Sequence, residues 1–414
     1  MRVEVCLLLC VVFCYGQDVL KNGNNTRVRN GLEEKIGNFS IELLYHTALV
    51  QAPTDNLIIS PFTVWTVLAV ISEGAMGRTR LEINNALRIS SRNNEMTRRQ
   101  YADIAQWLQV KTNTIELAKY NAIFVDKQGL PLPDFQESAK RYYDTNMISL
   151  TFTDNENAAN LVNNAISNFT HGRIPKIVES SNFKDTKMLI TSALYFKGQW
   201  TIPFNASSTT VEPFYNSNGT KIGEVKMMYN RGTYPFANIK ELKARVIELP
   251  YGKENRLSMI IMLPNHGVSL EDMFRNFLTV PLDLFFEELR ISKEEFADDE
   301  VDCFLPRFKI QSDLDISDVL QSQFHIKDLF DSTNARLPNI ARTPMYVSKV
   351  IHKAEIDVTE EGTTASAVTV AEFSNRIGAV RFEANRPFTY IIVEKMTNSI
   401  QVCYILNFSA LSFD

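Results

Sequence analysis

The chain is poor in the features that would mark an enzyme or a metal-binding module. It contains no Gly-x-Ser-x-Gly elbow, no His-Glu-x-x-His pair, no glycine-rich phosphate loop and no Cys-x-x-Cys beyond its first sixteen residues. Its 5 histidines are scattered without the spacing of metal ligands. These absences argue against an enzyme and predict neither a metal ion nor a cofactor.

Cysteine is also scarce. The chain of 414 residues has 5 cysteines, three of them near the N-terminus, which leaves Cys303 and Cys403 in the rest. Each lies in an apolar, strand-like run. A disulfide between them and two buried free thiols are both open, and we favour free thiols because unpaired cysteine behaves as a small apolar residue.

Long apolar runs are missing as well. Residues 5–13 are apolar but too few to span a bilayer, and no later run of 18 apolar residues follows. Arg2 before this run and Gly16 before Gln17 are typical of a secretory leader. We therefore expect residues 1–16 to be a signal peptide and the mature chain to be secreted, with no membrane anchor.

The charge balance is slightly acidic. The formal net charge is −5, from 43 basic and 48 acidic residues. This balance argues against general binding to nucleic acid or to anionic membranes. Arg98, Arg99 and Lys111, around Tyr101, are too few for a convincing heparin-like site and are interrupted by Asp103, so we expect no glycosaminoglycan binding.

A secreted chain can be glycosylated, and this one carries six Asn-x-Ser/Thr sequons. They are at Asn24, Asn38, Asn168, Asn205, Asn218 and Asn407. Asn24 and Asn218 lie in polar, turn-like surroundings and are good acceptors. Asn38 and Asn407 lie in apolar periodic segments, where burial could prevent modification.

The organisation of the chain indicates one large domain. Residues 17–32 are polar and rich in Gly and Asn, which is typical of a disordered tail, and no Gly/Ser- or Pro-rich linker follows. Helical spacing dominates the first half and predicts, among others, a helix at residues 155–169. Strand-like runs dominate the second half, at residues 188–196, 244–249, 257–263, 301–310, 345–358, 389–393 and 400–408. We therefore predict an α+β domain over residues 33–414.

The most informative segment lies near the C-terminus, directly after the run at residues 345–358. It consists of two acids, a glycine and then small or β-branched residues: Glu360, Glu361, Gly362, Thr363, Thr364, Ala365, Ser366 and Ala367. Small side chains permit backbone movement, while Thr and Val favour strands. The segment is suited either to an ordinary exposed loop or to a loop that can become a buried strand.

Several other motifs decide between these alternatives, because in order along the chain they resemble the serpin family over nearly the whole mature length. The motifs are NLIISPF (56–62), GAMGRT (74–79), TSALYFKGQW (191–200), ELPY (248–251), LPRF (305–308), HKA (352–354) and RPF (386–388). The resemblance implies a single domain with three β-sheets, eight or nine helices and an exposed reactive loop at about residues 360–384.

The resemblance also assigns roles to individual residues. Arg376 lies fourteen residues after Gly362 and eleven before Pro387, as the scissile residue does in serpins, so the reactive bond would be Arg376–Ile377. Residues 360–367 would be the hinge that enters the sheet, with Thr363, Ala365 and Ala367 facing inward. A polar network under the sheet would comprise Ser60, Thr63, Ser192 and His352, and Trp200 would mark the point of entry.

These roles predict the function. We expect a monomeric, secreted, suicide-type inhibitor that traps an extracellular trypsin-like serine protease as a covalent complex, since Arg376 suits a specificity pocket with a carboxylate at its base. The alternative is a non-inhibitory serpin that serves as a carrier or storage protein, although such members usually have bulky, charged or proline residues in the hinge. Trapping of trypsin as an SDS-stable adduct would separate the two.

Overall fold

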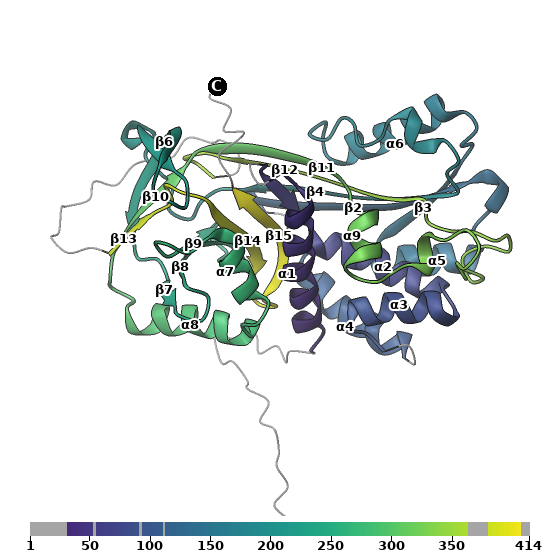
Figure 1. The fold of residues 1–414 in the computed structure, drawn as a ribbon, viewed down its shortest axis with the longest axis horizontal. Coiled ribbons are helices and arrows are strands. Elements are labelled where there is room, and N and C mark those ends of the chain that lie inside the picture. Colours follow the sequence, from purple (N-terminus) through teal and green to yellow (C-terminus); the bar gives the residue numbers. More distant parts are fainter. Residues whose placement is uncertain (1–30, 53–54, 91–92, 111, 363–379, 407–414) are drawn as a thin grey trace, which may run out of the picture.

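The structure is a computed structural model that describes residues 31–52, 55–90, 93–110, 112–362 and 380–406 (Figure 1). Within these ranges it has nine α-helices and three β-sheets, which confirms the predicted α+β architecture. The helices are α1 (Leu32–Val50), α2 (Pro61–Gly74), α3 (Gly77–Leu87), α4 (Asn94–Trp107), α5 (Pro133–Tyr143), α6 (Asn155–Phe169), α7 (Leu270–Phe277), α8 (Leu282–Glu295) and α9 (Ser317–Ser322). Four short 3₁₀ turns, η1 to η4, are at Lys127–Gly129, Ser180–Phe183, Ala206–Ser208 and Asp328–Phe330.

The sheet that carries the site has five strands, and we call it the main sheet. Its order is β11 (Phe308–Asp315), β12 (Lys349–Val358), β4 (Met188–Gly198), β2 (Ile115–Asp126) and β3 (Thr145–Leu150). Strand β4 is buried on both faces, which explains why its sequence reads as a continuous apolar run rather than an alternating one.

Two further sheets complete the fold. The six-stranded sheet has the order β1 (Leu57–Ile59), β15 (Ser399–Leu406), β14 (Phe388–Glu394), β9 (Leu257–Pro264), β8 (Ala244–Tyr251) and β7 (Phe236–Ile239). The four-stranded sheet has the order β13 (Val380–Glu383), β10 (Val301–Pro306), β6 (Lys221–Gly232) and β5 (Thr210–Tyr215).

Helix α6 covers one face of the main sheet, and α2, α3, α4, α5 and α9 lie on the other side (Figure 1). The Asp154 side chain caps α6 by accepting a hydrogen bond from Asn157 N at 3.3 Å. Ala158, Val162 and Ile166 then form a stripe that packs on the sheet. The helix ends before Gly172, whose φ of 78° is left-handed.

Helix α2 is the central support beneath the main sheet. It contacts β2 and β4 of the main sheet, β15 of the six-stranded sheet, and helices α1, α3 and α5. Because neighbours surround it, all of its residues except Glu73 are buried, and its apolar residues form no single stripe. Ser60, just before its first residue, therefore lies deep in the molecule.

One sequence prediction about the strands is wrong. Residues 301–310 were expected to form a single strand, but β10 ends at Pro306 and β11 begins at Phe308 in a different sheet. Proline has no N–H for a strand ladder, while Arg307 N still donates to Lys226 O of β6 at 2.8 Å, so the chain leaves the four-stranded sheet only after Arg307. Helix α1 begins at Leu32, the last residue of the predicted tail.

Candidate functional site

The boundary between β12 and β4 is the feature from which the site is built, and we call it the seam. The two strands run parallel and pair from Lys349 with Leu189 to Glu355 with Tyr195. Beyond that point β12 continues to pair with β11 as far as Val358, and β4 with β2 as far as Gly198. Among the described ladder pairs, the last three residues of each strand are therefore not joined across the seam, which opens toward residue 362.

A tight turn at residues 359–362 closes this open end. Thr359 N donates to Gly362 O at 2.7 Å, and Gly362 N donates to Thr359 O at 3.2 Å. The Thr359 hydroxyl adds a hydrogen bond of 2.9 Å to the same Gly362 oxygen. The reversal of the chain therefore lies within the predicted hinge, whose first three residues, 360–362, belong to this turn.

The turn is docked on the segment that follows β4. Trp200 donates twice to it, from Nε1 to Thr359 O at 3.0 Å and from its backbone N to Glu361 O at 3.0 Å. Phe204 N donates to Glu360 O at 2.7 Å. The Trp200 ring is held in place by stacking on Tyr251, with centroids 4.5 Å apart and planes at 12°.

Glycine is required at position 362 by this docking. Its φ of 137° lies in a region that L-residues rarely adopt. A Cβ there would overlap Gly198 O and would lie 2.6 Å from Gln199 Cα and 2.9 Å from Trp200 N. The turn can approach the end of β4 this closely only because residue 362 has no side chain.

The two hinge acids have different surroundings. Glu360 accepts a hydrogen bond of 2.8 Å from Thr209 Oγ1, and its other oxygen lies 3.8 Å from Arg307 Nη1. Glu361 Oε2 is buried without a hydrogen-bond partner among the described residues. Sequence reasoning missed Thr209 and Arg307 as partners, and no local signal identifies them because both are distant in sequence.

The polar network below the seam brings together the four residues named from the sequence. His352 is fully buried; its Nε2 accepts a hydrogen bond from Ser60 N at 2.9 Å, and its Nδ1 lies 2.7 Å from Ser192 Oγ. Thr63 Oγ1 donates to Ser60 O at 2.9 Å. Since Nε2 accepts, Nδ1 carries the proton and donates to Ser192.

Burial determines the charge of this histidine. It lowers the pKa of His352 from its ordinary value to about 3, so the ring is neutral at physiological pH. A neutral ring can bridge Ser60 and Ser192 with one acceptor and one donor, as observed. The hydrogen bond from His352 to Ser192 crosses the seam and joins β12 to β4.

Other predicted residues are placed as follows. Residues 363–367 of the hinge and the reactive bond Arg376–Ile377 lie outside the described residues, as do Asn24 and Asn407. Asn168 and Asn218 are exposed, whereas Asn38 and Asn205 are half-buried. Cys303 and Cys403 are free, buried thiols, which confirms the alternative that we favoured.

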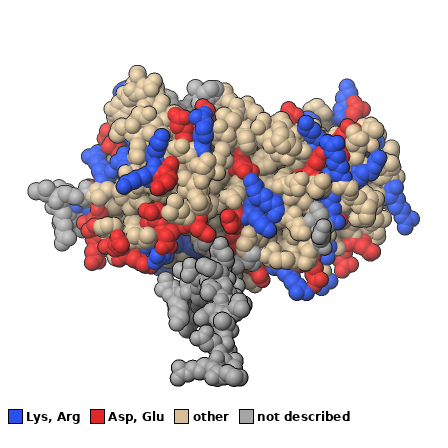
Figure 2. All heavy atoms as spheres, turned by 60° about the horizontal axis from the view of Figure 1, so that its bottom comes forward, with Lys and Arg blue, Asp and Glu red and all other residues tan. Residues whose placement is uncertain are grey.

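The two basic residues described on the helix around Tyr101 are both paired with acidic side chains. Arg98 Nε donates to Glu73 at 2.9 Å, and Arg99 pairs with Glu95. Lys111 lies outside the described residues. On the face shown in Figure 2, basic side chains are interspersed with acidic ones.

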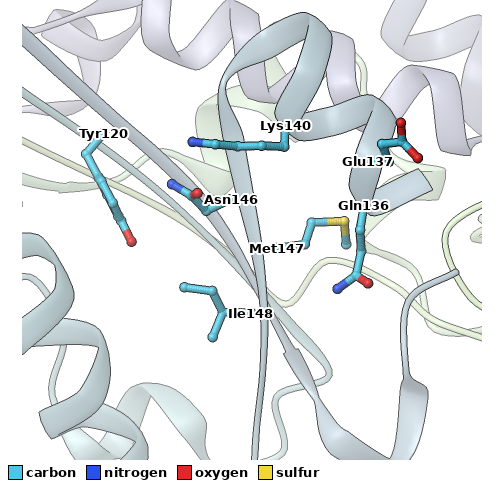
Figure 3. A pocket seen from close by; sticks show the side chains of 7 residues that line it. All are labelled: Tyr120, Gln136, Glu137, Lys140, Asn146, Met147 and Ile148. Atoms are coloured by element: carbon cyan, nitrogen blue, oxygen red, sulfur yellow. The ribbon is translucent and has the colours of Figure 1, made fainter. Parts of the chain in front are cut away.

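A shallow pocket lies at the far edge of the main sheet (Figure 3). Its volume is about 540 Å³, and its lining residues are Tyr120, Gln136, Glu137, Lys140, Asn146, Met147 and Ile148. They come from β2, α5 and the edge strand β3, so strand β4 lies between the pocket and the seam. In the described part of the chain, no cluster of His, Cys, Asp or Glu could hold a metal, and no helix there is long and apolar enough to cross a membrane.

Comparison with known proteins is consistent with this geometry. The sequence model of the family described as Serpin (serine protease inhibitor) matches residues 34–403. Leukocyte elastase inhibitor of Bos taurus is 34% identical over 376 residues, which are 87% of this chain and 95% of that protein. Serpin B9 of Homo sapiens is 31% identical over 381 residues, 90% of this chain and 98% of that protein.

A solved structure shares the same fold. The crystal structure of human thyroxine-binding globulin superposes with a TM-score of 0.79 at 24% identity, covering 90% of this chain and 97% of that one. At this identity the likeness concerns the fold alone.

Proposed function

The chain belongs to the serpin family, and from this premise we propose that it inhibits a trypsin-like serine protease by inserting its cleaved loop into the seam between β12 and β4. The protease serine attacks the Arg376 carbonyl carbon, the bond to Ile377 breaks, and the Ile377 amine leaves with the proton passed on by the protease histidine. The product is an acyl-enzyme ester at Arg376.

The observation that carries this proposal is the parallel pairing of β12 with β4. After the turn at residues 359–362, a strand returning along β12 would run antiparallel to it. Because β4 is parallel to β12, that strand would be antiparallel to β4 as well. One parallel ladder would be exchanged for two antiparallel ladders, which are slightly more stable per residue.

The unpaired end of the seam, which lies next to Gly362, supports insertion that begins at this end. The three final residues of each strand are already separated, so the first inserted residues displace no ladder pair. Farther down, entry must break the pairs from Glu355–Tyr195 to Lys349–Leu189 and the hydrogen bond from His352 to Ser192. The closed seam and this network would together hold the loop outside the sheet until cleavage frees it.

Hinge composition fits the same role. Residues 363–371 contain no charge and no proline, and Arg376 is the one basic residue between Thr364 and Val380. The relative named leukocyte elastase inhibitor indicates by its name a different protease target. The choice of a trypsin-like enzyme therefore rests on Arg376 alone.

We further propose secretion after removal of residues 1–16, glycosylation at the exposed Asn168 and Asn218, and action as a monomer without a cofactor.

Incubation of the purified mature chain with trypsin tests the proposal. We expect an SDS-stable adduct and a released C-terminal fragment that begins at Ile377. Arg376→Lys is the matched control that keeps a trypsin site and should still trap the enzyme, whereas Arg376→Ala should not. Cleavage without an adduct would contradict the inhibitory role and favour the carrier alternative.

Hinge substitution tests the insertion step. Thr363→Arg would place a charge on the inward face of the entering strand, so the chain should be cut as a substrate instead of forming the adduct. Thr364→Arg is the matched control, because its side chain would face outward and trapping should persist. Equal trapping by both variants would mean that the facing of the inserted strand is assigned wrongly.

A further inference from the structure

Asn121 of β2 has a buried amide oxygen without a hydrogen-bond partner among the described residues. The residue is 5% exposed, and its Oδ1 is inaccessible and has no hydrogen-bond partner among the described residues. A buried acceptor without a donor destabilises the state in which it occurs. The closed sheet therefore carries a polar group that another state could satisfy.

The side chain belongs to a row of three residues, Asn121, Ser192 and His352, that crosses the main sheet on the face toward α2. Asn121 is the ladder partner of Ser192, and Ser192 is the ladder partner of His352. Directly opposite residues on neighbouring strands point to the same face of a sheet. His352 faces Ser60 at the start of α2, so Ser192 and Asn121 face α2 as well.

Ser192 lies between His352, with which it shares a hydrogen bond, and Asn121, whose amide oxygen has no described partner. Its Oγ accepts from His352 Nδ1 at 2.7 Å on the β12 side. Its own hydroxyl hydrogen has no described acceptor, while Asn121 Oδ1 on the β2 side has no donor. Rotation about the Cα–Cβ bond of serine moves the hydroxyl between staggered positions, so it can turn from one neighbouring strand to the other.

Insertion into the seam would require such a turn; this step of the argument rests on the proposed function. When β12 and β4 separate, Ser192 loses His352. The ladder between β2 and β4, from Ile115–Gly198 to Val125–Met188, does not cross the seam. Asn121 would therefore stay opposite Ser192 while His352 moves away.

We propose that Asn121 is a positioning residue for strand insertion: its amide oxygen accepts the Ser192 hydroxyl once β12 has moved away. This hydrogen bond replaces the one lost to His352 and satisfies the acceptor that is unpaired in the closed sheet. Asn121 thereby favours the open sheet over the closed one without contacting the protease or the scissile bond.

The test uses a reaction that needs no protease. A synthetic peptide that copies residues 363–376 is annealed to the intact mature chain, and its incorporation rate is followed by native gel electrophoresis. Asn121→Leu keeps the side-chain size but removes the acceptor, and we expect annealing to slow about three- to tenfold, the effect of one hydrogen bond. If the leucine variant does not fold, Asn121→Ala takes its place.

Two further variants separate this role from a general packing effect. Thr191→Val removes another buried hydroxyl without a described partner, on the neighbouring residue and the opposite face, and should anneal at the wild-type rate. In a Ser192→Ala background, Asn121→Leu should cause no additional slowing, because the donor is already absent. Unchanged annealing in Asn121→Leu, or equal slowing in the Ser192→Ala background, would overturn the proposal.

The outcome is distinguishable from failure of the proposed function. If the wild-type chain anneals the peptide but traps no trypsin, the inhibitory function fails while the role of Asn121 is still measured. If the wild-type chain does not anneal the peptide, the seam does not open and the role of Asn121 is refuted.

Discussion

Substitution of Gly362 by alanine should release the turn at residues 359–362 from Trp200. Two costs arise in the docked state. Alanine at a φ of 137° is strained by about 1–3 kcal/mol. The contacts of its Cβ with Gly198 O, Gln199 Cα and Trp200 N add about 1–3 kcal/mol of overpacking.

The turn can also detach from Trp200, so the loss of stability cannot exceed the free energy of docking the turn. It would break the hydrogen bonds from Trp200 N to Glu361 O, from Trp200 Nε1 to Thr359 O and from Phe204 N to Glu360 O. Three such bonds at about 0.5–1.5 kcal/mol each amount to about 1.5–4.5 kcal/mol. This is comparable to the summed strain, so we expect the turn to detach while the rest of the fold persists.

Native-state hydrogen exchange measures this opening directly. The amides of Trp200 and Phe204 should lose protection by about 10- to 1000-fold in Gly362→Ala, since each factor of ten corresponds to about 1.4 kcal/mol.

Gly219→Ala is the matched control. Gly219 also has a positive φ, of 80°, but a Cβ there would meet nothing within 4 Å. It should leave the protection of Trp200 and Phe204 unchanged. Unaltered protection in Gly362→Ala, or the same loss in Gly219→Ala, would refute the steric argument.

Three further predictions follow from the same residues. The pKa of His352 is about 3 in the folded chain against about 6.5 in the unfolded chain, so the unfolded state binds the proton first and the free energy of unfolding falls as the pH drops from about 6.5 toward 3. The loss should reach about 5 kcal/mol and should be absent in His352→Gln, and urea titrations at several pH values measure it. Burial raises the pKa of the Cys303 and Cys403 thiols, so the native mature chain, which lacks residues 1–16 and their three cysteines, should not react with a thiol reagent at pH 8. A rapid native-state reaction would contradict the placement of Cys303 and Cys403. Cleavage at Arg376–Ile377 should raise the thermal unfolding midpoint measured by circular dichroism, because the freed strand adds ladder hydrogen bonds; equal midpoints for the cut and intact chains would rule out insertion.

Local pattern was sufficient to predict many elements. The helix expected at residues 155–169 is α6 with the same bounds, because a capped amphipathic stripe specifies a helix without reference to the rest of the chain. The apolar run at residues 188–196 became β4, although its pattern did not reveal which strands lie beside it. The single strand expected at residues 301–310 was divided between two sheets, since the change of sheet at Pro306 depends on which strands are available to pair.

The candidate site divides in the same way. The sequence by itself determined the small, uncharged composition of the hinge, the glycine at position 362 and the isolated Arg376, because these are properties of residue type and spacing. Only the tertiary structure decided that β12 pairs with β4 and that this pairing stops three residues before the end of each strand. It also decided that Glu360 lies against Thr209 and Arg307, and that Asn121 is the ladder partner of Ser192. Those relations join residues far apart in the chain, and they depend on the register of strands that no local pattern encodes.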